Sequence, residues 1–336
     1  MMTEPSNPER REALKKIVTG GAALVAGAAF VSHEDRVHAG QLARWTERSP
    51  DVPPDVWWQA HTNWGKLSDL KKKVTTETIK GLEISRMIMG SNLVNGWSHS
   101  RDLLYVAESM RAYHTREKTF AMLKLGEACG INAYSAGGEN MNLMTDYWEN
   151  AGGTMRFIVQ ASTLDEALHC LDRGASTAYL HGGICDHLVH ERNFDVITAF
   201  VEGMRRRGAV VGIGAHRLEA IKGCVENGIE PDYWASAIHH GNYWSRMPDK
   251  PEYNNVWCRH PEETIEFMDA LPQPWIGFKV LAAGAIQPHD GFRWAFEAGV
   301  DFQSVGMYDF HVVDNVNTFM DILDSDINRK RPWRFT

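Results

Sequence analysis

The feature that most constrains the fold is a repeated alternation between short apolar runs and longer stretches with helical spacing. The apolar runs lack a polar face, which is typical of strands that are buried on both sides of a parallel sheet. The runs lie at 84–90, 131–136, 155–161, 177–181, 209–215, 233–239, 275–282 and 302–307. The helical stretches lie at 114–129, 139–151, 164–174, 193–208, 217–228, 260–271, 289–299 and 311–324. The pattern predicts an α/β chain with a parallel sheet.

Eight strand–helix units in roughly 250 residues match the count of a (β/α)8 TIM barrel. No long linker interrupts the series, so we predict a single barrel domain over residues 79–325. A polar, tryptophan-bearing N-terminal extension at 40–78 precedes the barrel, and a C-terminal tail at 326–336 follows it. In such a barrel the active site lies at the carboxyl ends of the strands, so we expect the catalytic residues among those that end or directly follow a strand.

The first 39 residues resemble an export signal. Arg10 and Arg11 precede a glycine- and alanine-rich apolar run at 17–31, and V-H-A at 37–39 resembles a cleavage site. The segment predicts a twin-arginine signal peptide, with the export machinery as partner and a periplasmic or otherwise exported location. The apolar run is too short and too weakly hydrophobic for a permanent membrane span. An amphipathic N-terminal helix is the alternative.

The net charge and the cysteine spacing argue against several classes of ligand and cofactor. A net charge of −8 over 336 residues leaves no basic face for nucleic acid. The five cysteines are odd in number and widely spaced, without a CxxC motif, which argues against a disulfide framework or a zinc ribbon. The expected partner is therefore a small-molecule substrate.

Histidines stand at three consecutive strand ends, as His181, His216 and the pair His239-His240. Adjacent strands lie about 4.8 Å apart, so these imidazoles can reach a common point. We expect them to bind a divalent transition metal (Zn, Mn, Fe or Ni), with one of His239 and His240 included, because consecutive residues of a strand face opposite sides. Alternatively, the imidazoles hydrogen-bond the oxygens of a substrate without metal.

Lys279 stands inside the seventh apolar run, in W-I-G-F-K-V-L-A-A-G. A buried ammonium is costly unless it is paired, and burial lowers its pKa toward neutrality. Such a lysine suits a general base, an oxyanion stabiliser or a Schiff-base amine. A structural lysine paired with a carboxylate inside the barrel is the alternative.

Further polar side chains at or just after strand ends are candidates for substrate binding. They are Asn92, His99, Tyr134, Asn242 and Tyr308. Their hydroxyl, amide and imidazole groups are suited to a polyhydroxyl substrate.

Five segments between residues 81 and 323 share a family likeness. They are G-L-E-I-S-R-M-I-M-G, A-C-G-I-N-A-Y-S-A, A-Y-L-H-G-G, G-I-G-A-H-R-L-E-A-I and S-V-G-M-Y-D-F-H-V-V-D-N-V. Together they resemble the aldo-keto reductase superfamily. The resemblance implies a TIM barrel with NADP as cofactor. It also implies that His181 is the catalytic histidine, that the strand ending at His216 holds the nicotinamide, and that Asn315 closes the cofactor segment.

At the family's other catalytic positions, this sequence has different residues. Tyr134-Ser135 stand where the family has its catalytic aspartate, and Gln160 stands near the position of its lysine. Where the family has its proton-donating tyrosine, the chain has G-G-E at 137–139. Without that aspartate and lysine, nothing lowers the pKa of a tyrosine donor. The departures therefore favour a different chemistry in the same barrel.

The main prediction is an exported, non-redox lyase, isomerase or hydrolase that acts on a polar substrate, of which a carbohydrate derivative is one candidate. Lys279, His181 and His216 are its predicted catalytic residues. The alternative is an NAD(P)-dependent oxidoreductase of aldo-keto reductase type, which would have to keep its cofactor tightly bound through export. A non-catalytic binding barrel is the third hypothesis.

Overall fold

A computed structural model describes residues 66–97, 99, 103–247, 249 and 256–336 of the chain. The predicted signal peptide at 1–39 and most of the predicted extension at 40–78 lie outside the described residues. None of the described helices is both long enough and apolar enough to cross a membrane.

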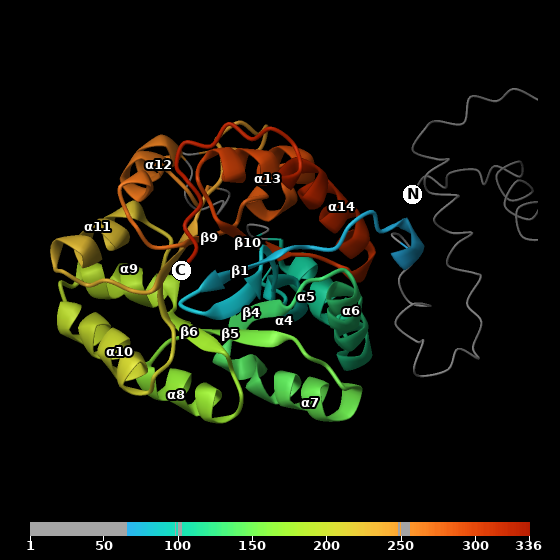
Figure 1. Cartoon of the computed structure of the whole chain (residues 1–336), viewed down its shortest axis with the longest axis horizontal. Helices are drawn as coiled ribbons and strands as arrows, with labels where there is room; N and C mark the ends of the chain where they lie inside the picture. Colours follow the sequence, from blue (N-terminus) through green and yellow to red (C-terminus); the bar gives the residue numbers. More distant parts are fainter. Residues whose placement is uncertain (1–65, 98, 100–102, 248, 250–255) are drawn as a thin grey trace, which may run out of the picture. The chain divides into compact units, whose positions relative to one another are not determined.

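Eight parallel strands close into a barrel in the order β10-β3-β4-β5-β6-β7-β8-β9 (Figure 1). The strands are β3 (Met87–Gly90), β4 (Ala133–Gly137), β5 (Arg156–Ala161), β6 (Thr177–Leu180), β7 (Val211–Ala215), β8 (Tyr233–Ala237), β9 (Trp275–Phe278) and β10 (Phe302–Gly306). Each strand pairs with the next one along the chain, and β10 pairs with β3 to close the ring. The predicted (β/α)8 barrel is confirmed.

The helices form a ring outside the strands (Figure 1). They are α4 (Asn92–Asn95), α5 (Leu104–Tyr113), α6 (Arg116–Ala128), α7 (Met141–Ala151), α8 (Leu164–Asp172), α9 (Gly182–His190), α10 (Phe194–Arg206), α11 (Leu218–Glu226), α12 (Pro261–Asp269), α13 (Pro288–Glu297) and α14 (Val312–Leu323). Short 3-10 turns are η1 (Leu67–Asp69), η2 (Gly138–Asn140), η4 (Ala282–Gly284) and η5 (Asp309–His311). The sequence did not predict α4, α5 or α9. Two glycines open α9, and glycine is a poor helix former.

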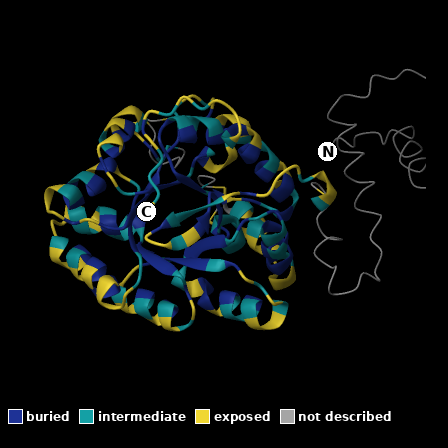
Figure 2. Cartoon of the chain, in the orientation of Figure 1, coloured by how far each residue is buried: buried dark blue, intermediate teal, exposed yellow. Residues whose placement is uncertain are grey.

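Alternating residues of each strand divide the core into two clusters. Ile88, Ile158 and Ile276 belong to the cluster inside the barrel, whereas their neighbours Phe157 and Trp275 pack with the helices. Figure 2 shows the result, with buried residues along the strands and the inner faces of the helices and exposed residues on the outer faces. The period of two that defines a strand therefore decides which side chains can reach the barrel mouth.

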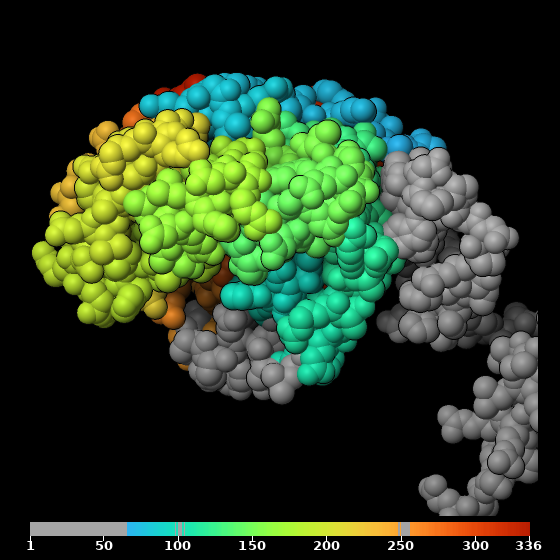
Figure 3. All heavy atoms as spheres, turned by 90° about the horizontal axis from the view of Figure 1, so that it is seen from below, coloured from blue at the N-terminus to red at the C-terminus, as the bar shows by residue number. Residues whose placement is uncertain are grey.

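An antiparallel hairpin precedes the barrel, formed by β1 (Thr76–Ile79) and β2 (Leu82–Ser85). Ile79 and Ile84 are fully buried and belong to the same cluster as the barrel interior, so the hairpin closes one end of the barrel. In the space-filling view the blue atoms of this segment cover that end (Figure 3). The predicted strand at 84–90 is thus divided at Arg86, and only Met87–Gly90 enters the barrel.

Asp301, just before β10, holds the C-terminal tail against this closed end. Its Oδ1 accepts hydrogen bonds from Arg329 Nη2 and the backbone N–H of Arg334, both at 3.1 Å. Its Oδ2 accepts from the backbone N–H of Trp275 at 3.0 Å and lies 3.6 Å from Arg331 Nη1. Asp301 and Arg331 are almost completely buried, so each charge depends on the other.

The substitution Asp301→Asn should lower the free energy of unfolding by about 3–5 kcal/mol, because it leaves the buried arginines without their counter-charge. Urea denaturation measures the change. Asp321→Asn is the matched control, since its ion pair with Lys71 is exposed and should contribute less than about 1 kcal/mol. Equal effects of the two substitutions would contradict this account of the tail.

Candidate active site

A cavity of about 1000 Å³ lies where the barrel strands end. Each of the eight barrel strands contributes lining residues from its last positions or from the residue that follows it. Of the predicted site residues, the cavity brings together His181, His216, Lys279, Asn92, His99 and Tyr308. Six of the predicted residues therefore line one cavity, and their roles in binding and catalysis stay predictions.

His181 follows β6 and is the N-cap of α9. Its Nδ1 accepts a hydrogen bond from the backbone N–H of Gly183 at 3.2 Å, so in the neutral ring the proton sits on Nε2. Burial lowers the pKa of His181, and the nearby His216 and Lys279 lower it further. The side chain is therefore a neutral N–H donor at the cavity.

His216 follows β7 and is oriented by Asp186 of α9. The carboxylate Oδ1 of Asp186 accepts from the backbone N–H groups of His216 (3.1 Å) and Arg217 (3.2 Å). Its Oδ2 lies 3.3 Å from His216 Nδ1. This pairing places the ring proton on Nδ1 and leaves Nε2 of His216 as the atom that can take or give a proton.

Gly182 allows the close packing of His216 against the start of α9. A Cβ atom at this position would lie 3.0 Å from Cε1 and 3.1 Å from Nδ1 of the His216 ring. The centroids of the His181 and His216 rings are 5.8 Å apart. The H-G-G sequence at 181–183 is thus what brings the two imidazoles together.

Lys279 follows β9 and lines the same cavity. Burial lowers its pKa from the ordinary value of a lysine to about 8, while the charge of Asp186 raises it. Its backbone has a φ of 60°, in the left-handed region that is strained for a residue with a Cβ. Such strain persists only where the surrounding structure holds the residue in place, and strained residues of this kind cluster at functional sites.

His99 and Trp257 form the side of the cavity next to Lys279. The ring centroids of His99 and Trp257 are 5.7 Å apart, and Lys279 Nζ lies 5.8 Å from the Trp257 ring centroid. Burial lowers the pKa of His99 to about 4, with further contributions from Lys279 and His216. His99 is therefore neutral near pH 7.

Glu139 stands where the resemblance placed a proton-donating tyrosine, and it lines the cavity. Its Oε1 accepts hydrogen bonds from Asn95 Nδ2 at 3.1 Å and from Asn140 Nδ2 at 3.2 Å. On the neighbouring strand, Gln160 Nε2 donates to Ser135 Oγ at 3.3 Å. This wall can hydrogen-bond hydroxyl or carbonyl groups of a ligand.

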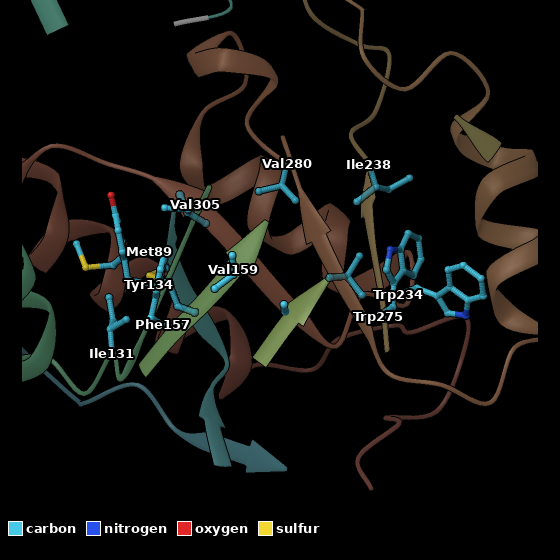
Figure 4. Packing of buried hydrophobic residues seen from close by; sticks show 14 of the residues in the cluster. Met89, Ile131, Tyr134, Phe157, Val159, Trp234, Ile238, Trp275, Val280 and Val305 are labelled. Atoms are coloured by element: carbon cyan, nitrogen blue, oxygen red, sulfur yellow. The ribbon is translucent and has the colours of Figure 1, made fainter. Parts of the chain in front are cut away.

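Tyr134 does not belong to the site. Its side chain is fully buried and faces the helices, where its ring stacks on Phe157 with centroids 6.3 Å apart (Figure 4). Burial raises the pKa of its hydroxyl. The prediction that it binds substrate is wrong because the alternation within β4 directs Tyr134 outward and Ser135 inward.

His239 and His240 also lie apart from the imidazole pair. His239 Nδ1 donates to the carbonyl of His240 at 2.8 Å, and its Nε2 accepts from the backbone N–H of Cys258 at 2.9 Å. His240 Nδ1 accepts from the backbone N–H of Asn242 at 3.1 Å. Both ring nitrogens of His239 thus serve the loop that follows β8.

The described residues contain no group of three or more His, Cys, Asp or Glu side chains placed to hold a metal ion. The predicted three-imidazole metal site is therefore not formed by these side chains. Asn242 is exposed and lies outside the cavity lining, so its predicted contact with substrate is also corrected.

Sequence analysis missed Asp186 and Trp257. Asp186 lies five residues after His181, on helix α9. This helix begins with two glycines, which are poor helix formers, so the sequence did not indicate a helix there. Trp257 lies on the long connection after β8, where no periodic pattern indicates which side chains turn inward.

The barrel resembles solved structures of aldo-keto reductases. One, from Pseudomonas aeruginosa and described as an aldo-keto reductase, has a TM-score of 0.54 at 14% identity, over 76% of this chain and 99% of that one. A second structure from the same organism has a TM-score of 0.53 at 14% identity, over 76% of this chain and 98% of that one. No protein-family model and no curated protein matches the sequence. The structural likeness establishes the fold.

Asp186→Asn should lower the pKa of Lys279 further, because Asp186 supplies the negative charge that raises it. The pH dependence of Lys279 acylation, followed by peptide mass spectrometry, measures the change. Asp195→Asn, on the exposed face of α10, is the control and should leave the midpoint unchanged. An unchanged midpoint in Asp186→Asn would mean that the carboxylate does not act on the lysine.

Acid should destabilise the chain through His239. Burial lowers its folded-state pKa to about 4, against about 6.5 in an unfolded chain. Below pH 6.5 the unfolded state takes up a proton that the folded state does not, so stability falls as the pH drops from 6.5 to 4. Between pH 7 and pH 5 this one group should remove about 2 kcal/mol.

Urea denaturation of the wild type and of His239→Gln at both pH values tests this linkage. The glutamine carbonyl can still accept from the backbone of Cys258 but does not titrate. The variant should therefore lose about 2 kcal/mol less than the wild type on acidification. The same loss in both proteins would show that another group is responsible.

Proposed function

We propose that the chain is an oxidoreductase of aldo-keto reductase type that reduces a small carbonyl compound in this cavity. The observation that carries the proposal is the convergence of two N–H donors, His181 and Lys279, at the carboxyl ends of a barrel whose fold is that of these reductases. An exported location, predicted from residues 1–39, is part of the proposal.

The fold implies a nicotinamide nucleotide, and the cavity fits one in two respects. Its volume of about 1000 Å³ is at the upper end of the range for ligand pockets and leaves room for a cofactor and a substrate. The N-terminus of α13 borders it without a side-chain cap, and N–H groups at a helix start attract phosphate. Gln287, the N-cap of α13, and Asn315, in the first turn of α14, would hold the nucleotide. When bound, the nucleotide supplies the hydride.

His181 binds the substrate carbonyl in this proposal. Because Gly183 fixes the lone pair on Nδ1, the Nε2–H points its donor at the ligand without any rearrangement of the protein. A preformed donor of this kind stabilises negative charge as it develops on the carbonyl oxygen.

Lys279 supplies the second donor and the proton. With a pKa of about 8, its ammonium is the main form at pH 7 and is acidic enough to give a proton to an alkoxide. It takes the task that a tyrosine performs in the family that the sequence resembles. The Trp257 ring beside Nζ limits the access of water to the ammonium.

A second candidate, proton transfer without redox chemistry, rests on the pairing of Asp186 with His216. With Nδ1 directed at the carboxylate, Nε2 of His216 can remove a proton next to a substrate carbonyl. The Lys279 ammonium would stabilise the resulting enolate. This arrangement suits an isomerase or lyase.

Equilibrium binding and turnover assays on the full chain separate the two candidates. Reduction predicts binding of NADPH or NADH and a loss of absorbance at the nicotinamide band when aldehydes are added. The absence of nucleotide binding at millimolar concentration would exclude this candidate. Exchange of substrate C–H hydrogens with deuterated water in the absence of nucleotide would support the second candidate.

His181→Ala should reduce kcat/KM for the carbonyl substrate by about 100-fold or more, since it removes a preorganised donor to the developing charge. His190→Ala is the matched control, because His190 is an exposed histidine at the other end of α9. Steady-state kinetics of both variants make the comparison. Equal activities would exclude His181 from the chemistry.

A further inference from the structure

Lys279 is a cation without a counter-ion in the part of the chain that the structure describes. Its Nζ makes neither a hydrogen bond nor an ion pair with described residues, and it lies 5.8 Å from the Trp257 ring centroid. Asp186 acts on it as a charge but is itself occupied by His216 and Arg217. An amine in this position is available to react with a ligand.

The geometry points to a covalent role: we propose that the neutral amine of Lys279 forms a reversible imine with aldehydes or ketones that enter the cavity. The inference goes beyond the proposed reduction, because the step requires no nucleotide. It rests on the cavity, on the unpaired amine and on the proton-handling groups around it.

The backbone at Lys279 supports this role. A φ of 60° takes the chain out of the direction of β9 immediately after Phe278, and positive φ recurs at Ala282 and Ala283. The strain is of order 1 kcal/mol or more for each such residue. It is concentrated in the segment that presents the amine to the cavity, where Phe278 also contacts the His216 ring at a centroid distance of 5.5 Å.

The reaction balances with groups that line the cavity. Nζ attacks the carbonyl carbon, and the oxygen gains the proton that Nζ loses, which gives a carbinolamine. Nε2 of His216 relays this proton, since its Nδ1 is directed at Asp186. The hydroxyl group then leaves as water with a second proton from the nitrogen, and the C=N bond forms. The Nε2–H of His181 hydrogen-bonds the oxygen until it leaves.

Protonation of the amine separates imine formation from reduction. The pKa of Lys279 is about 8, so the neutral amine is available near neutral pH. Asp186 raises this pKa. Lys279 also interacts electrostatically with the imidazoles of His99, His181 and His239, and His216 contacts Phe278, the residue before the lysine. The ammonium donates to a carbonyl and the neutral amine attacks one, and both forms are present within about one pH unit of this pKa.

Reductive trapping tests the proposal with hydroxyacetone as probe and sodium cyanoborohydride as reductant. At pH 7.5 the neutral fraction of an amine with a pKa of about 8 exceeds that of an ordinary lysine roughly a hundredfold. Peptide mass spectrometry of the wild-type chain should therefore find Lys279 carrying the probe mass less one oxygen atom. We expect it to be labelled about 10-fold faster, or more, than exposed lysines.

The variant Lys279→Arg keeps the charge but cannot form an imine, so its cavity label should disappear. Lys330→Arg, an exposed lysine paired with Glu262, is the matched control and should leave the Lys279 label unchanged. Labelling of Lys279 no faster than that of surface lysines would overturn the proposal, and mapping in the wild type makes this result independent of variant folding. Because the assay contains no nucleotide, its outcome is separate from that of the nucleotide-binding test.

Discussion

The carboxylate of Asp186 is the interaction on which the candidate site depends. One oxygen holds the backbone N–H groups of His216 and Arg217, and the other directs the His216 ring. The same charge opposes the effect of burial on Lys279. A single side chain in the middle of α9 thus positions one imidazole, sets the tautomer of its ring and raises the pKa of the amine against the effect of burial. All three must be correct together for carbonyl chemistry at neutral pH.

The barrel itself could be predicted from the sequence, because strand and helix periods alternate without interruption and leave few other folds. The division of the first run at Arg86 could not. Arg86 Nε donates to the carbonyl of Asp301 at 2.7 Å, a contact between residues 215 positions apart. The sequence pattern around Arg86 contains no information about a hydrogen-bond partner so far away along the chain. Helix α9 was missed for a different reason, since its glycines serve the packing of His216 at the expense of helix propensity.

The site was predicted in part, and the successes and errors have a common physical origin. His181, His216 and Lys279 follow strands directly, so the ends of the strands were sufficient to place them. The prediction for Tyr134 was wrong because a shift of one residue along a strand changes whether a side chain faces the cavity or the helices. The prediction that His239 could bind metal was wrong because backbone N–H groups of the loop after β8 donate to its Nε2. A pattern of side-chain types gives no information about such backbone donors.

The closed end of the barrel has a consequence for how the chain matures. The backbone of Thr336 pairs with Thr78 and Gly81 of the hairpin, and Arg329 and Arg331 neutralise Asp301. These contacts join the last residues to the first strands, so the barrel cannot be sealed while residues 329–336 are still inside the ribosome. The seal at this end therefore forms only after all eight barrel strands have left the ribosome.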